Sequence, residues 1–129
     1  MPSLAALPPL VLVMLGGSVG AGARFLLGRQ LFEAFGPGLP FGTWSVNIIG
    51  GLLMGLLAGG LVRTGGSEPL RLLLGVGVLG GFTTFSAFSL EVFGMLTSGD
   101  AVLAAAYAVS SVVGSVLALY AGVLLMRVL

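Results

Sequence analysis

Two groups of polar residues interrupt apolar stretches of this sequence at helical spacing. Thr43 and Asn47 are four residues apart, and Tyr107, Ser111 and Ser115 form a series at i, i+4 and i+8. Residues at this spacing lie on one face of a helix. An amide and a line of hydroxyls can pass an ion along, or they can bond to neighbouring helices. The spacing alone leaves both interpretations open.

The segment GGFTTFSAFS, residues 80–89, interrupts a third apolar stretch. Gly80 and Gly81 predict a break in a helix, and the groups exposed by a break inside a membrane must be buried in protein or line a cavity. Free carbonyls suit a cation such as sodium, and free N–H groups suit an anion. Phe85 and Phe88 are three apart, so both rings can turn their positive edges toward an anion. Simple packing of the rings is the alternative.

Two charged residues lie within or beside apolar stretches. Arg24 ends the run GGSVGAGARF, where it either reaches the lipid headgroups or attracts anions to a vestibule. Glu91 is the one acid well inside an apolar stretch, which makes it a candidate functional residue. It can pair with a cation, accept hydroxyl bonds or carry a proton.

The composition predicts an integral membrane protein. The 129 residues are 57% hydrophobic and 7% charged, with a mean hydropathy of +1.20, so a polar surface cannot cover the fold in water. A net charge of +1 without a clustered basic face argues against nucleic acid as a partner. The chain has no Cys or His, which excludes disulfides, thiol catalysis and haem or ordinary zinc sites. No P-loop motif is present, and we predict that the protein is not an enzyme.

Four apolar segments are long enough to span a membrane, for which about 20 residues are needed. The predicted fold class is an all-α membrane protein whose third helix is broken near its middle. Residues 1–129 then form a single four-span domain, placed as a multi-pass protein in the cell (inner or plasma) membrane. The predicted spans are Leu7–Leu27 with an extension to Phe35, Phe41–Val62, Leu70–Leu96 and Ala101–Val128.

Small residues recur at intervals of four in all four spans, as in Gly16 and Gly20 or Gly51 and Gly55. Such stripes let helix backbones approach closely in lipid. Four helices barely enclose a pathway, so we predict an oligomer. Three arginines fall on the side of the termini and two on the other, which is a poor orientation signal. Either one loop charge is misplaced, or the chain inserts both ways and forms an antiparallel dual-topology homodimer.

Three stretches together resemble the Fluc (CrcB) family of fluoride channels. They are GGSVGAGARF at 16–25, GTWSVNIIG at 42–50 and GVLGGFTTFSAFSLE at 77–91. The resemblance covers essentially the whole chain, and the third motif is the most specific. Ala87 stands where the family usually has Thr, and Phe25 stands where Tyr is common.

The resemblance implies a passive fluoride channel that exports cytoplasmic fluoride through two pores in each antiparallel homodimer. Carbonyls of Gly80 and Thr83 from both copies are implied to hold a central structural sodium ion, with Arg24 and Glu91 in supporting roles. The lipid bilayer, fluoride and a second copy are the implied partners. The implied fluoride pathway consists of an amide, phenyl ring edges and hydroxyls: Thr43, Asn47, Phe85, Phe88, Tyr107, Ser111 and Ser115.

Two other functions remain alternatives. A small multidrug-type exporter is also a four-span protein, and it would use Glu91 to bind cations and couple protons. A structural membrane subunit without a pathway would leave the polar faces as contacts between helices.

Overall fold

The structure is a computed structural model that describes residues 3–129, and these residues form helices joined by short connections. Four helical segments are long and apolar enough to cross a membrane, as the sequence predicts: Pro9–Phe35, Phe41–Arg63, Glu68–Thr97 and Ala101–Val128. The first reaches the extended limit of its predicted span, and the third begins two residues earlier than predicted. The protein is therefore a multi-pass membrane protein.

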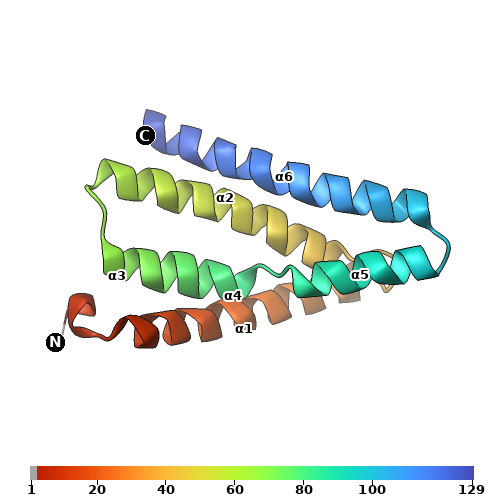
Figure 1. Ribbon diagram of the computed structural model, residues 1–129, viewed down its shortest axis with the longest axis horizontal. Coiled ribbons are helices and arrows are strands. Elements are labelled where there is room, and N and C mark those ends of the chain that lie inside the picture. The colour runs from red at the N-terminus through yellow and green to blue at the C-terminus, as the bar shows by residue number, and fades with distance from the viewer. Residues whose placement is uncertain (1–2) are drawn as a thin grey trace.

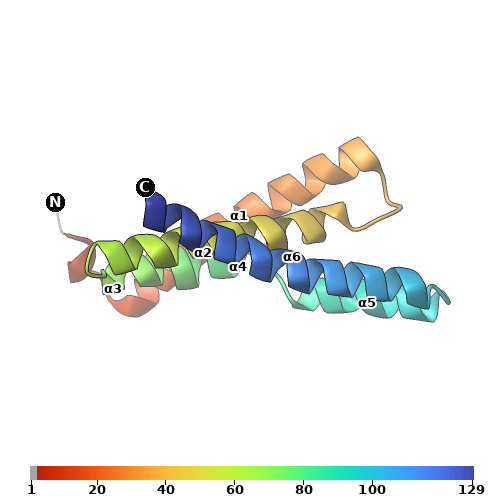
Figure 2. The same cartoon turned by 90° about the horizontal axis from the view of Figure 1, so that it is seen from above.

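The first, second and fourth segments are the single helices α1 (Pro9–Phe35), α2 (Phe41–Arg63) and α6 (Ala101–Val128). A short 3₁₀ turn, η1 (Leu4–Ala6), precedes α1. Both termini and the connection after α2 lie at one end of the molecule, and the connections before α2 and α6 lie at the other (Figure 1). Viewed from above, the C-terminal half of α1 diverges from the end of the molecule where α6 begins (Figure 2).

The third segment is divided into four parts and a break. It consists of α3 (Glu68–Leu70), the π-helical η2 (Arg71–Leu79), α4 (Gly80–Phe82) and α5 (Ser86–Thr97). The predicted break is confirmed, but it lies at residues 83–85 rather than at the glycines. Gly80 is helical, with φ −63° and ψ −38°, and the chain becomes extended at Thr83, with φ −82° and ψ 158°.

The glycines before the break serve packing instead. A Cβ added at Gly81 would lie 2.5 Å from the carbonyl oxygen of Gly17 in α1. A Cβ added at Gly20 would overlap the carbonyl oxygen of Val78. These contacts are closer than any side chain allows, so α1 and the third segment touch backbone to backbone. The small-residue stripes thus act as the sequence predicts.

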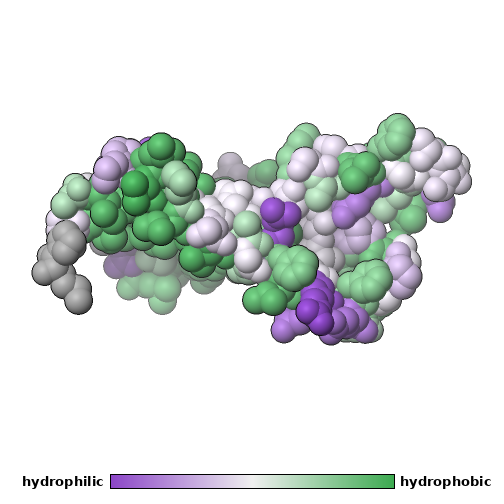
Figure 3. All heavy atoms as spheres, turned by 90° about the horizontal axis from the view of Figure 1, so that it is seen from below, coloured by the Kyte–Doolittle hydropathy of each residue, from purple (hydrophilic) through white to green (hydrophobic). Residues whose placement is uncertain are grey.

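Apolar side chains cover most of the outside. Large hydrophobic residues such as Leu10, Val62 and Val128 are exposed in the single chain. Figure 3 shows mostly hydrophobic residues over the left half of the lower face, and hydrophilic residues among hydrophobic ones over the right half. An apolar exterior of this kind is suited to lipid or to a second membrane helix.

Replacing Gly20 tests the backbone contact between α1 and the third segment. Gly20→Ala forces the two helices apart and is expected to destabilise the fold by about 1–3 kcal/mol, as overpacking does. The measurement is thermal unfolding in detergent, followed by far-UV circular dichroism.

Gly22→Ala is the matched control, because it lies two residues away on the same helix with no atom near an added Cβ. It should leave stability unchanged or raise it by up to about 1 kcal/mol, since alanine favours a helix. Equal destabilisation by both substitutions would contradict the close backbone contact.

Candidate functional site: a polar cluster and groove beside the break

Glu91 joins three helices through two hydroxyl groups. Thr43 of α2 donates its Oγ1 proton to Glu91 Oε1 at 2.7 Å, and Tyr107 of α6 donates its hydroxyl proton to Glu91 Oε2 at 2.5 Å. The two ion pairs within residues 3–129 lie elsewhere. Of the three predicted uses of this acid, the structure therefore shows acceptance of hydroxyl bonds.

Asn47 holds the backbone at the break. Its Nδ2 donates to the carbonyl of Thr84 at 3.0 Å, and the Thr84 N–H donates to Asn47 Oδ1 at 2.8 Å. The amide thus replaces the helical partners that Thr84 lacks. One N–H of the Asn47 side chain remains for another acceptor, because the amide nitrogen carries two. Thr43 and Asn47 share a helix face, but they bind different segments.

An open groove of about 410 Å³ lies between α2, the break and α6. It brings together six of the nine predicted pathway or cation residues, whereas Thr43, Tyr107 and Gly80 lie outside its lining, as do Arg24 and Glu91. The six are Asn47, Thr83, Phe85, Phe88, Ser111 and Ser115.

Ser111 is the distinctive group in this groove. The residue is 4% exposed, and its Oγ has no hydrogen-bond partner within the described residues. A buried hydroxyl without a partner costs about 1–3 kcal/mol. A hydrogen-bond partner that reached this hydroxyl would recover that cost.

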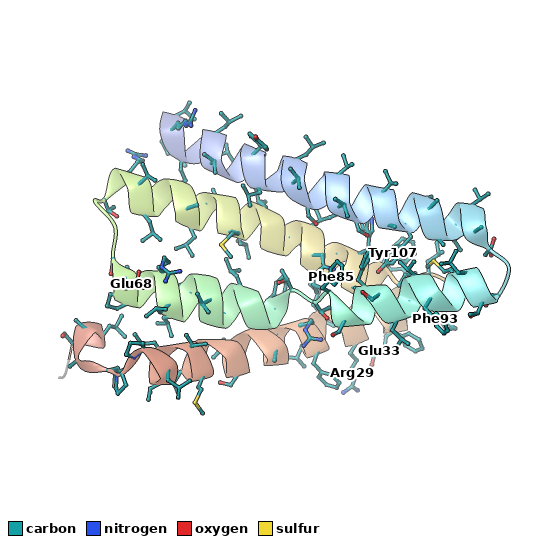
Figure 4. All side chains as sticks on the ribbon, in the orientation of Figure 1. Arg29, Glu33, Glu68, Phe85, Phe93 and Tyr107 are labelled. Atoms are coloured by element: carbon teal, nitrogen blue, oxygen red, sulfur yellow. The ribbon has the colours of Figure 1, made fainter. Side chains whose placement is uncertain are left out.

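Phe88 connects the groove to the Glu91 cluster. Its ring centroid lies 5.5 Å from that of Phe85 and 5.4 Å from that of Tyr107, with tilted planes in both pairs. Phe85 is 77% exposed and so presents most of its ring outside the single chain. Figure 4 shows Phe85 at the break and Tyr107 in the space between α5 and α6.

The Arg24 side chain lies beside the break in the third segment. It is part-buried in the middle of α1, and its Nε donates to the carbonyl of Gly81 at 3.1 Å. This corrects the interpretation of Arg24 as a residue at a helix end. Its guanidinium also lines a second cavity of about 530 Å³ toward α1, together with Arg29 and Thr84. Ala87 also lines that cavity, and its position there carries no hydroxyl.

The carbonyls of Gly80 and Thr83 accept no hydrogen bond from any residue between 3 and 129. The helix ends beside them, so their usual N–H partners are absent. The Thr83 side chain bonds back to the carbonyl of Leu79 at 2.9 Å. The backbone oxygens of Gly80 and Thr83 are therefore left without a hydrogen-bond donor beside the break.

Three contributors to the site were missed from the sequence. They are Thr84, Trp44 and Ser110, and the last of these lies off the face that carries Tyr107, Ser111 and Ser115. Trp44 Nε1 donates to Ser110 Oγ at 3.0 Å. The sequence does show a tryptophan three residues before Asn47, which was the available signal for a site residue. The helix that the Trp44 side chain faces depends on the rotation of α2 about its axis.

Comparison with known proteins gives a consistent result. The family model described as "CrcB-like protein, Camphor Resistance (CrcB)" matches residues 11–123, a range that contains every site residue above. The curated relatives include proteins named "Fluoride-specific ion channel FluC". That of Sphingopyxis alaskensis is 56% identical over 116 residues, covering 89% of this chain and 92% of the relative. That of Phenylobacterium zucineum is 58% identical over 120 residues, covering 92% of this chain and 94% of the relative.

Removing the hydroxyl of Tyr107 tests the cluster. Tyr107→Phe leaves one oxygen of Glu91 without its donor, and a hydrogen bond to a charged group contributes about 1.5–3 kcal/mol. We expect the unfolding temperature in detergent to fall accordingly.

The matched control is Tyr120→Phe on the same helix, where the side chain is 63% exposed. Its unfolding temperature should equal that of the unsubstituted protein. A Tyr107→Phe protein as stable as this control would show that the contact with Glu91 contributes nothing.

Proposed function

This chain belongs to the CrcB-like family, and from that premise we propose that it is a passive, fluoride-selective channel that lets cytoplasmic fluoride leave across the cell (inner or plasma) membrane. The choice of fluoride as the ion is supported by the names of the relatives. The groove supplies the physical support, because its uncharged lining contains a buried hydroxyl without a partner and an amide with a spare N–H.

Fluoride is small and strongly hydrated, so a pathway must replace its water with hydrogen-bond donors. The Ser111 hydroxyl and the second Asn47 N–H can both donate to an anion in the groove. No Arg or Lys lines the groove, so nothing there holds the ion too tightly to release it. The polar track then runs along α6 from Ser115 past Ser111.

The phenyl rings complete the lining. A ring edge carries a partial positive charge, so Phe85 and Phe88 offer weak contacts to an anion without binding it as a charge would. Because Phe88 also packs against Tyr107, the rings connect the groove to the first hydroxyl of the α6 series. Conduction needs this succession of weak sites.

The proposed assembly is an antiparallel homodimer with two pathways. The open side of the groove and the exposed ring of Phe85 support a second copy as the missing wall. The arginine count supports it less than the sequence implied. Arg24 lies beside the break and so does not count toward either end. Arg29 alone then stands against the three arginines at the end that carries the termini, so the charge bias toward a single orientation is stronger than the sequence count indicates.

The carbonyls of Gly80 and Thr83 fit a structural sodium ion. They are hard oxygen ligands without other partners, which is the donor type that sodium requires. When bound, the ion would supply positive charge to neutralise the carbonyl dipoles of the two copies at the break. The residues of this chain hold the surrounding backbone in place, Asn47 from α2 and Arg24 from α1.

Fluoride release from liposomes tests the proposal. Purified protein should release fluoride rapidly and chloride slowly, as measured with ion-selective electrodes. Phe85→Ile replaces a ring edge with an aliphatic group, and we expect at least a tenfold loss of fluoride flux.

Phe93→Ile is the matched control, because Phe93 on α5 is exposed like Phe85 but does not line the groove. Absence of fluoride flux from a folded protein would refute the channel. Proton-coupled cation flux abolished by Glu91→Gln would identify an exporter instead, and no flux of either kind would identify a structural subunit.

Removing the hydroxyl of Ser111 should separate stability from conduction. Ser111→Ala removes a buried group that lacks a partner, so stability should stay unchanged or rise by about 1 kcal/mol. Fluoride flux should fall about tenfold, because a donor is lost. Ser18→Ala, an exposed serine bonded to its own helix, is expected to change neither quantity. Loss of stability in Ser111→Ala would mean that the hydroxyl is already paired.

A further inference from the structure

Trp44 and Ser110 form a directed chain of hydrogen bonds that ends at Tyr107. The indole N–H of Trp44 donates to Ser110 Oγ at 3.0 Å, and the Ser110 hydroxyl donates to the Tyr107 carbonyl at 3.2 Å. The Ser110 hydroxyl therefore donates its proton within α6 and accepts the indole N–H of Trp44. The indole in this way fixes the turn of α6 that carries Tyr107.

Adjacent residues of α2 reach the two other helices of the cluster. Thr43 bonds to Glu91 on α5, and Trp44 bonds to Ser110 on α6. The Tyr107 hydroxyl closes the triangle by donating to Glu91. A shift of α2 relative to α6 would therefore change the distances from both hydroxyls to the same carboxylate.

Packing alone does not hold the helices at this end. The close contact of α2 with α6 lies further along, where a Cβ added at Gly51 would overlap the Ser115 carbonyl oxygen. At the Trp44 end, a cavity of about 270 Å³ lies beside Trp44, Tyr107 and Ser110. In addition, α5 has no buried side chain. Hydrogen bonds therefore act beside core contacts, such as those of the buried Tyr107 and Ala104, in setting the geometry around Glu91.

We propose that Trp44 is a positioning residue, which acts through Ser110 to hold the Tyr107 hydroxyl on Glu91. The expected effect of Trp44 on fluoride flux rests on the channel function proposed above, because the Glu91 cluster lies next to the groove. The structural part of the proposal stands on the hydrogen bonds alone.

A double-mutant cycle in liposomes tests this role. Trp44→Phe keeps an aromatic ring but loses the N–H, and Ser110→Ala loses the acceptor. Each should lower fluoride flux about threefold, the factor that corresponds to an average interhelical hydrogen bond in a membrane. The double variant should be no slower than either single variant, since both remove the same contact. Ser18→Ala is the control and should conduct like the unsubstituted protein.

Tryptophan fluorescence gives a second readout that does not depend on flux. Trp44 is the one tryptophan of the chain, so the emission reports on the surroundings of this indole. Loss of the indole hydrogen bond in Ser110→Ala should shift the emission to shorter wavelength. Glu91→Gln should also shift it in the unsubstituted background and should cause no further shift in the Ser110→Ala background.

The outcomes separate the two proposals. Independent losses of flux that multiply to about ninefold in the double variant would overturn the positioning role, as would unchanged flux in Trp44→Phe. An emission wavelength of Trp44 that does not change in Glu91→Gln would overturn the positioning role too. If the unsubstituted protein conducts no fluoride, the channel function fails, and the emission measurements still decide whether Trp44 is coupled to Glu91.

Discussion

The break in the third transmembrane segment imposes the constraint on which the rest of the structure depends. Inside a bilayer no water is available to backbone groups that lose their helical partners. Asn47 supplies both a donor and an acceptor to Thr84, and Arg24 supplies a donor to the carbonyl of Gly81. The polar residues of α1 and α2 are therefore placed where the third segment needs them, and the carbonyl oxygens of Gly80 and Thr83 are left without a donor.

Close backbone packing makes these polar contacts geometrically possible. Glycine contacts bring α1 within reach of the segment before the break, and similar contacts join α2 to α6. A side chain as short as that of Asn47 then reaches the neighbouring backbone directly. After the break the packing is looser, and Glu91 with its two hydroxyl donors holds α5 instead. Close backbone packing thus holds the part of the molecule before the break, and polar contacts hold α5 after it.

The contrast between the groove and its surroundings supports anion conduction. Ser111 is buried without a partner, while the charges of Arg24 and Glu91 lie outside the lining of the groove. A deep charge would hold an anion or exclude it, whereas neutral donors and ring edges allow it to bind and leave. The open side of the groove is the feature that a second copy of the chain would complete.

The sequence by itself determined the four spans, the break and the small-residue contacts, because these depend on composition and local periodicity. It also grouped the hydroxyls of α6 on one face. Only the tertiary structure decided which groups meet, as in the contact of Arg24 with Gly81 across 57 positions. Such contacts depend on the rotation of each helix about its axis, which residue spacing leaves free. The position of the break was misread for a related reason: glycine permits both an irregular backbone and close packing, and only the neighbouring helix distinguishes the two.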